Sequence, residues 1–189
     1  MNISRSGRGP STLYRVAALL VVALTLAGVV AHQGMAAGPG KMITLGESLN
    51  DAEKQELLDY FGAKSNDKII TVTVADTKKD MDGLINASFD TAYSSTALTC
   101  RPLGDGLDVS IRNITLITPS MYAMALVTAG IGDATLIVAA PNDAPAGGQT
   151  ALSGVFKAWK KAPCDSGSTS PARQRLALEE LALTADIGS

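Results

Sequence analysis

Residues 107–141 read LDVSIRNITLITPSMYAMALVTAGIGDATLIVAAP, and this stretch decides the class of fold. It opens with alternating and β-branched residues, which predict a strand. Thr118 is a helix N-cap residue, and Pro119 suits the first helical position because its missing N–H costs nothing there. Gly130 ends the helix, and apolar residues at 135–140 predict a second strand. This order of elements is typical of a βαβ unit.

The same order occurs earlier in the chain. Residues 42–45 predict a short strand, and Asn50 then caps a helix, with a glutamate three residues on to complete a capping box. Gly62 ends that helix. The β-branched stretch 68–75 gives the strongest strand signal in the chain, and the polar residues 77–90 predict an irregular segment. Two βαβ-like units are therefore expected.

The segment between these units predicts a β-hairpin. Residues 93–101 are a strand candidate, Gly104-Asp105-Gly106 supplies turn chemistry, and a strand over 107–117 follows. The sequence therefore predicts an α+β fold: a mixed β-sheet with helices packed on it, two βαβ-like units joined by the β-hairpin, and C-terminal helices. Aromatic residues make up only 4% of the chain, so we expect a core of Val, Ile, Leu and Ala.

The C-terminal part predicts two helices. Thr150 is expected to cap the first, and Ser170 the second, with Pro171 at the first helical position and an end at about Thr184. Large apolar residues of the first helix fall at the i, i+3, i+4, i+7 spacing of a core-facing stripe: Leu152, Val155, Phe156 and Trp159. This helix is therefore expected to pack into the core.

The last helix carries too many large apolar residues for a solvated tail. Leu178 and Leu181 share one face, whereas Leu176 and Leu183 share another, one turn round. If one stripe packs on the domain, the other stays exposed and offers a surface for self-association or for an envelope protein. The open alternative is a helix that lies flat with both stripes buried, or one that frays. These four leucines are the candidate partner interface.

Residues 1–37 predict a signal peptide or an N-terminal membrane anchor. The segment up to Arg15 carries three arginines and no acid, and residues 16–31 read VAALLVVALTLAGVVA, without a charge. This order predicts a cleaved secretory signal. An uncleaved anchor helix is the alternative, because the apolar run has the shortest length that can span a bilayer. We therefore expect a secreted or extracytoplasmic protein that meets the membrane only through this segment.

The remaining chain is expected to hold one domain. Residues 38–41 are small and Gly-rich and predict a linker, 42–165 form the α+β domain, and 166–189 form the C-terminal helix. The formal net charge of the chain is −2, and without the three leader arginines it is −5. A mildly acidic domain lacks the clustered basic face that supplies most nucleic-acid affinity, so we expect no nucleic-acid partner.

The residue types exclude several kinds of chemistry. The only histidine is His32, in the leader or linker, so the folded domain has no Ser-His-Asp or Cys-His arrangement and no His-ligated zinc. Asp80-Met81-Asp82-Gly83 is a poor EF-hand loop, because alignment on its glycine puts Lys78 and Phe89 at the first and last ligand positions. We predict no catalytic residue, no cofactor and no metal site.

Two function classes remain. The leading one is a non-catalytic binding or structural module of the cell envelope. The alternative is a carboxylate-dependent hydrolase that acts on the envelope, which needs two acids and no histidine. Two carboxylates facing each other across a cleft would favour the hydrolase. Residues 147–150, GGQT, lead into a helix N-terminus that could hold an anion, and the competing interpretation is a capped helix with a flexible entry.

Cys100 and Cys164 are the only two cysteines. Because exported proteins mature in an oxidising compartment, we expect them to form a disulfide. The bridge would attach the segment after the Trp159 helix to the end of a strand. The alternative is two separate thiols, one of them buried.

Four segments together resemble a known family. They are ITLGESLNDAEKQELLDYFG (43–62), the stretch 94–141, TALSGVFKAW (150–159) and ALEELALTADIG (177–188). They resemble the YpuA-like family of predicted secreted proteins, the domain of unknown function numbered one thousand and two. The resemblance implies an extracytoplasmic domain and supplies no activity, no catalytic residue and no ligand. Members of that family carry a further helical region after the last segment, which we expect this chain to lack.

Overall fold

The computed structural model describes residues 41–84, 89–161, 164 and 169–187, all within the unit Gly38–Ser189. The predicted leader lies outside the described residues. The strands are β1 (Met42–Gly46), β2 (Lys68–Val72), β3 (Ser95–Cys100), β4 (Leu107–Arg112) and β5 (Ala134–Ala139). The helices are α2 (Asp51–Phe61), α3 (Val74–Met81), α4 (Pro119–Ala129), α5 (Gln149–Lys161) and α6 (Pro171–Ile187).

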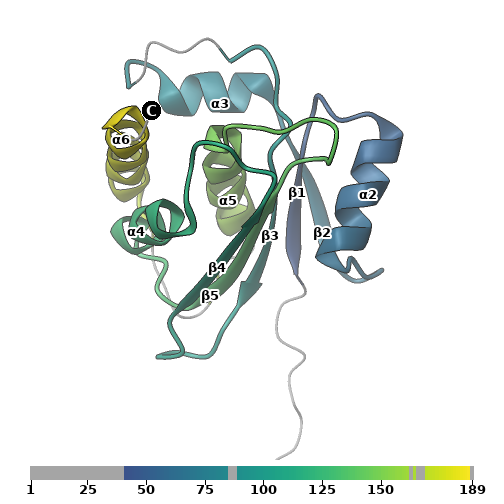
Figure 1. The fold of residues 1–189 in the computed structure, drawn as a ribbon. Helices are drawn as coiled ribbons and strands as arrows, with labels where there is room; N and C mark the ends of the chain where they lie inside the picture. The colour runs from purple at the N-terminus through teal and green to yellow at the C-terminus, as the bar shows by residue number, and fades with distance from the viewer. Residues whose placement is uncertain (1–40, 85–88, 162–163, 165–168, 188–189) are drawn as a thin grey trace, which may run out of the picture. The chain divides into compact units, whose positions relative to one another are not determined.

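The strands form one mixed five-stranded sheet of order β2-β1-β3-β5-β4 (Figure 1). β1 pairs parallel with β2 through α2, and β4 pairs parallel with β5 through α4. β3 runs antiparallel to both of its neighbours, β1 and β5. The predicted α+β class, the mixed sheet, the two βαβ units and the C-terminal helices are therefore confirmed.

Helix ends form where the sequence predicts them. The Asn50 side chain accepts a hydrogen bond from Glu53 N at 3.0 Å, and Glu53 Oε2 accepts one from Asn50 N at 2.6 Å. Thr118 caps α4 through a bond from Met121 N, at 3.3 Å. Gly62 and Gly130 end α2 and α4 in the left-handed conformation, with φ of 60° and 88°. These motifs depend only on residues a few positions apart.

The predicted β-hairpin is wrong. β3 and β4 are not paired, because β5 lies between them and hydrogen-bonds to both. A parallel partner must reach β4 through the α4 crossover, which sets β5 directly beside it. The glycines of the expected turn serve the same arrangement: Gly104 N and Gly106 N donate to Asp133 Oδ1, at 2.9 and 2.8 Å, immediately before β5.

The predicted strand over 68–75 is too long, and the predicted irregular segment after it is wrong at its start. β2 ends at Val72 because Thr73 caps α3 in a capping box with Asp76. Lys157 on α5 donates to Asp76 Oδ2 at 2.6 Å and so holds the new helix against its neighbour. Thr150 is also not a cap, because α5 begins at Gln149 and Thr150 lies in its first turn.

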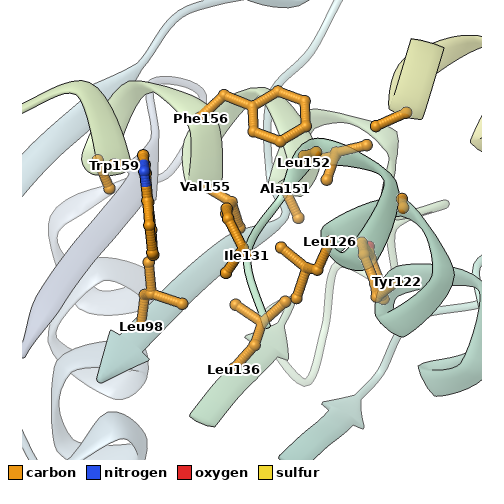
Figure 2. Packing of buried hydrophobic residues seen from close by; sticks show 14 of the residues in the cluster. Leu98, Tyr122, Leu126, Ile131, Leu136, Ala151, Leu152, Val155, Phe156 and Trp159 are labelled. Carbon is orange, nitrogen blue, oxygen red and sulfur yellow. The ribbon is translucent and has the colours of Figure 1, made fainter. Parts of the chain in front are cut away.

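Helices cover both faces of the sheet (Figure 1). Because strand side chains alternate, Ile43 faces the α2 side with Leu57, whereas Met42 faces the larger core with Trp159. Figure 2 shows this larger core, where α4 and α5 side chains meet those of β3 and β5. The predicted α5 stripe is buried at every position: Leu152, Val155, Phe156 and Trp159 are at most 2% exposed.

Candidate functional site

A polar pocket of about 340 Å³ lies between residues 89–94 and 145–150. The first segment leads into β3, and the second joins β5 to α5. Because β3 is antiparallel to the other four strands, its amino end lies at the same sheet edge as their carboxyl ends. In open sheets with helices on the faces, ligands bind at this edge because the N-termini of helices gather there.

Backbone hydrogen bonds hold one wall of the pocket, the segment 144–148. Ala146 N donates to Asn113 O at 3.3 Å, and Ala146 O accepts from Thr115 N at 2.9 Å. Ile117 N donates to Gly147 O at 3.1 Å. These bonds therefore attach the loop before α5 to the segment that joins β4 to α4.

Tyr122 fixes the last residue of this wall. Its side chain is fully buried, and its hydroxyl donates to Gly148 O at 2.6 Å. Burial raises the pKa of Tyr122 far above its ordinary value, so the hydroxyl stays a neutral donor. A Cβ atom on Gly148 would lie 2.4 Å from that hydroxyl oxygen, so only glycine fits here. The start of α5 is thus built on a buried contact from α4.

The opposite wall is attached to the turn that follows β1. Ala92 N donates to Ser48 Oγ at 2.8 Å, and Ser48 N donates to Ala92 O at 3.2 Å. Gly46 permits this approach, because a Cβ atom there would lie 1.9 Å from Ala92 O. Both walls are therefore fixed by contacts outside the pocket.

Several donors on the pocket wall have no acceptor in the described part of the chain. They include the backbone N–H groups of Gly147, Gly148, Gln149 and Thr150. The hydroxyls of Ser94 and Thr150 also lack a partner there, and because they are not among the buried polar atoms left without a hydrogen bond, they are open to the pocket, although the residues as a whole are only 2% and 6% exposed. The pocket therefore suits a ligand that accepts hydrogen bonds.

Among the described residues that line this pocket, Asp90 is the one that carries a charge. Its carboxylate lies 3.7 Å from Lys78 Nζ, and its side chain is 77% exposed. The charge at the mouth is therefore solvated and faces a cation, whereas the donors lie deeper on the wall.

The structure joins Cys100 to Cys164 in a disulfide, with Cα atoms 5.5 Å apart. This is the pairing that the sequence predicts. Cys100 is the last residue of β3, and Cys164 follows α5 and is 3% exposed. The bridge closes a sequence separation of 64 residues. Its position away from the pocket gives it a structural part in the fold.

The four candidate interface leucines separate into two pairs. Leu178 and Leu181 are 4% and 1% exposed and belong to the core, whereas Leu176 and Leu183 are 55% and 66% exposed. The two-stripe arrangement expected from the sequence is the one that forms, so only Leu176 and Leu183 are available to a partner.

An apolar groove of about 530 Å³ lies where α4 and α6 pack together. Its lining includes Met124 and Val127, which are 49% and 63% exposed, and Glu180 of α6. Thr128 Oγ1 donates to Glu180 Oε2 at 2.5 Å across the two helices. Leu176 and Leu183 lie one turn to either side of Glu180 on α6, and neither is among the described residues that line the groove.

Asp80 has no facing acid among the described residues that line its cleft, whereas the hydrolase requires a facing pair. Asp76 and Asp80 lie one turn apart on α3 rather than across a cleft. Although burial raises the pKa of Asp76, hydrogen bonds from Lys157 and Thr73 outweigh it and hold the pKa below its ordinary value. Burial raises the pKa of Asp80, which lines a cleft of about 170 Å³ with no second carboxylate among its described lining residues. Because Asp76 stays ionised and is paired with Lys157 of α5, its role is structural.

The described residues also contain no cluster suited to a metal ion. No group of three or more His, Cys, Asp or Glu side chains lies close enough together there to hold one. In the same part of the chain, no helix has the length and apolar character needed to cross a membrane.

Part of the pocket is predictable from the sequence. Residues 147–150, considered from the sequence as a helix start that could hold an anion, line the pocket. That interpretation missed Ser94 and Tyr122, because nothing in the spacing along the chain brings either residue to that loop. The signal that existed was the pair of adjacent glycines before a helix.

The described residues define an α+β domain with a mixed sheet, a single disulfide and a polar pocket at the carboxyl ends of its strands. The chain belongs to the family described as protein of unknown function (DUF1002), whose model matches residues 45–189. The predicted resemblance to YpuA-like proteins is thereby confirmed.

The chain is similar to "Uncharacterized protein YpuA" from Bacillus subtilis (strain 168). The two are 35% identical over 149 residues, which is 78% of this chain and 50% of the relative. The chain thus spans about half the length of this curated relative. No solved structure matches it.

Proposed function

We propose that this chain is an exported protein whose folded part is a non-catalytic binding module of the cell envelope. Its binding site is the pocket between residues 89–94 and 145–150. The unpartnered donors of that pocket, held on a fixed frame, are the observation that carries the proposal.

Two features support the extracytoplasmic location. The cationic start and the apolar run of residues 16–31 have the order of a secretory signal. The Cys100–Cys164 bridge is of the kind that persists in oxidising compartments. Neither feature depends on the pocket, so location and binding are tested separately.

The location is tested by N-terminal sequencing of the mature protein from fractionated cells. We expect cleavage between Ala31 and Gly38, where small residues follow the apolar run. An intact Met1 in the membrane fraction would identify an uncleaved anchor, and recovery from the cytoplasm would contradict export.

The binding proposal is tested by filling the pocket. Thr91 lines the pocket and is exposed, so Thr91→Trp places an indole at its mouth without disturbing the core. Immobilised wild-type protein is expected to retain small molecules or glycan from envelope extract, and the variant is expected to lose them. Thr71→Trp, an exposed position on β2 outside the pocket, is the matched control. Equal retention by Thr91→Trp would exclude this pocket.

The alternative function is a carboxylate-dependent hydrolase of the envelope. Asp80 favours it, because a raised pKa suits a general acid. The absence of a facing carboxylate in the described cleft favours the binding module instead. We expect no soluble sugar to be released from envelope glycan by the wild-type protein. Release that disappears in Asp80→Asn would establish the hydrolase.

We also propose that the exposed side of α6 is the surface through which the protein self-associates or binds an envelope protein. Leu176 and Leu183 support this, because two large apolar side chains stay exposed beside the apolar groove of α4.

A further inference from the structure

We propose that the pocket binds an oxyanion, the carboxylate, phosphate or sulfate group of an envelope ligand. This inference rests on the proposed function, because it gives the binding module its class of ligand. It is carried by two independent sets of donors that face the same space from different segments of the chain.

The first set is the backbone at the start of α5. The N–H groups of Gly147, Gly148, Gln149 and Thr150 have no acceptor in the described part of the chain. They precede and open a helix of 13 residues, whose dipole places partial positive charge at this end. An oxyanion accepts several N–H bonds at once, as it does at other helix N-termini.

The second set is a pair of hydroxyls that are open to the pocket although they belong to largely buried residues. Thr150 is 6% exposed and lies in the first turn of α5, whereas Ser94 is 2% exposed and lies on the opposite wall, just before β3. Neither hydroxyl has a partner in the described residues. Thr150 lies inside the first turn of α5 rather than before it, and Ser94 lies more than fifty positions earlier in the sequence. Neither hydroxyl is therefore the usual N-cap of this helix. They can donate to one ligand from two sides.

The frame that holds these donors needs no rearrangement. Tyr122 fixes Gly148 O, and the strand-like contact between Ile114 and Ala146 fixes the preceding loop. A ligand that meets donors already in place loses little ordering entropy on binding. The left-handed Gly148, with φ of 107°, turns the backbone into the helix at this point.

The charges around the pocket set the class of ligand. Asp90 opposes an anion, but its carboxylate is 77% exposed and lies 3.7 Å from Lys78, so solvent and the cation weaken its field. The other described lining residues carry no charge. Free N–H donors on the wall disfavour a cation, and they bind a charged oxygen more strongly than a neutral one.

The test is a titration of ¹⁵N-labelled mature protein with sodium phosphate, sodium sulfate and sodium acetate at fixed pH and ionic strength. The amide resonances of residues 147–151 are expected to shift saturably with at least one of the three. The strongest of the three ions identifies the group. Absent shifts, or unsaturable shifts that also occur at the Thr118-capped start of α4, would overturn the inference.

Three variants assign the binding to this pocket. Thr150→Val keeps the shape and removes the hydroxyl, and is expected to raise the Kd about tenfold. Thr150→Ser keeps the hydroxyl and is expected to bind within about threefold of wild type. Thr71→Val repeats the first change on the exposed edge of β2 as the control. Unchanged affinity in Thr150→Val would overturn the inference.

The inference and the proposed function can fail separately. If Thr91→Trp abolishes retention of envelope material while no anion shifts these amides, the oxyanion inference is wrong and the proposed function stands.

Discussion

Gly148 stands at the start of α5 with a φ of 107°, which L side chains rarely adopt. A Cβ atom there would lie 2.4 Å from Tyr122 Oη and 2.8 Å from a methyl carbon of Ile114. We therefore expect Gly148→Ala to lower the free energy of unfolding by about 2–4 kcal/mol, because backbone strain and overpacking add. Urea unfolding followed by the fluorescence of Trp159, the only tryptophan, measures this.

Gly132→Ala is the matched control for this change. A Cβ atom added to Gly132 would have no other heavy atom within 4 Å, and the φ of this residue is outside the left-handed range. We expect a change within about 0.5 kcal/mol. Equal losses in the two variants would show that Gly148 has no special place in the fold.

Tyr122 makes stability depend on pH in the alkaline range. Because burial raises its pKa in the folded state, the protonated form stabilises the protein fully below the unfolded pKa of about 10. That stabilisation is lost as the pH rises above this value, at up to about 1.4 kcal/mol per pH unit. Tyr122→Phe should lack this part of the loss while being about 1 kcal/mol less stable at pH 7.

The comparison is made by urea unfolding at pH 8, 10 and 11. Tyr60→Phe serves as the control, because Tyr60 is 40% exposed and packs beside Arg112 at the surface. An alkaline loss of stability that is as steep in Tyr122→Phe as in Tyr60→Phe would exclude Tyr122 as its source.

At the scale of single residues, local interactions predicted the ends of α2 and α4 correctly, but the cap expected at Thr150 does not form and the capping box at Thr73 was missed. Asn50 and Thr118 cap their helices, and Gly62 ends α2, because each contact spans only a few positions. Ser94 and Tyr122 meet the loop before α5 only through the tertiary fold, so no local pattern could place them. The donor loop of the pocket was predictable, and its opposite wall was not.

At the scale of elements, the errors arise where two structures compete for the same residues. The β-branched run 68–75 favours a strand throughout, but the Thr73–Asp76 capping box competes for its end and is reinforced by Lys157 from α5. The glycines at 104 and 106 favour a tight turn, but Asp133 accepts their N–H groups and β5 takes the place beside β3. In the second case a distant partner decides between two structures that the local sequence allows, and in the first a distant contact reinforces a local one.

The disulfide joins two elements that no other covalent link holds together. In the chain-entropy model, a bridge between residues 64 positions apart stabilises the fold by about 4 kcal/mol. We expect Cys100→Ser/Cys164→Ser to lose about this amount in urea unfolding. Reductant should destabilise the wild type by a similar amount and leave the double variant unchanged. A wild type that is indifferent to reductant would show that the bridge is not formed or not stabilising.

At the scale of the whole molecule, the two stripes of α6 have different roles. Leu176→Gln/Leu183→Gln changes only exposed side chains, so we expect it to keep the wild-type free energy of unfolding within about 0.5 kcal/mol per site. Sedimentation should show weaker self-association, or capture of the envelope partner should be lost. Leu178→Ala, at a buried position, should instead cost about 2–5 kcal/mol.

The contrast between these variants tests the interface. If the double variant keeps both the association state and the partner capture of the wild type, the exposed stripe is not a joining surface. Deletion of the whole helix would not answer the question, because Leu181 and Ala177 are part of the core.

The sheet order also constrains how the chain can acquire its structure while it is being made. β4 has a single neighbour, β5, and that neighbour is encoded after it, beyond the α4 crossover. A ribosome delivers residues 107–112 before residues 134–139, so a nascent chain passes through a stage in which β4 has no partner and β3 has an open side. Unpaired strands at that stage can pair with another chain. Until residues 134–139 emerge, the two strands that will flank β5 therefore offer open edges to any other chain nearby.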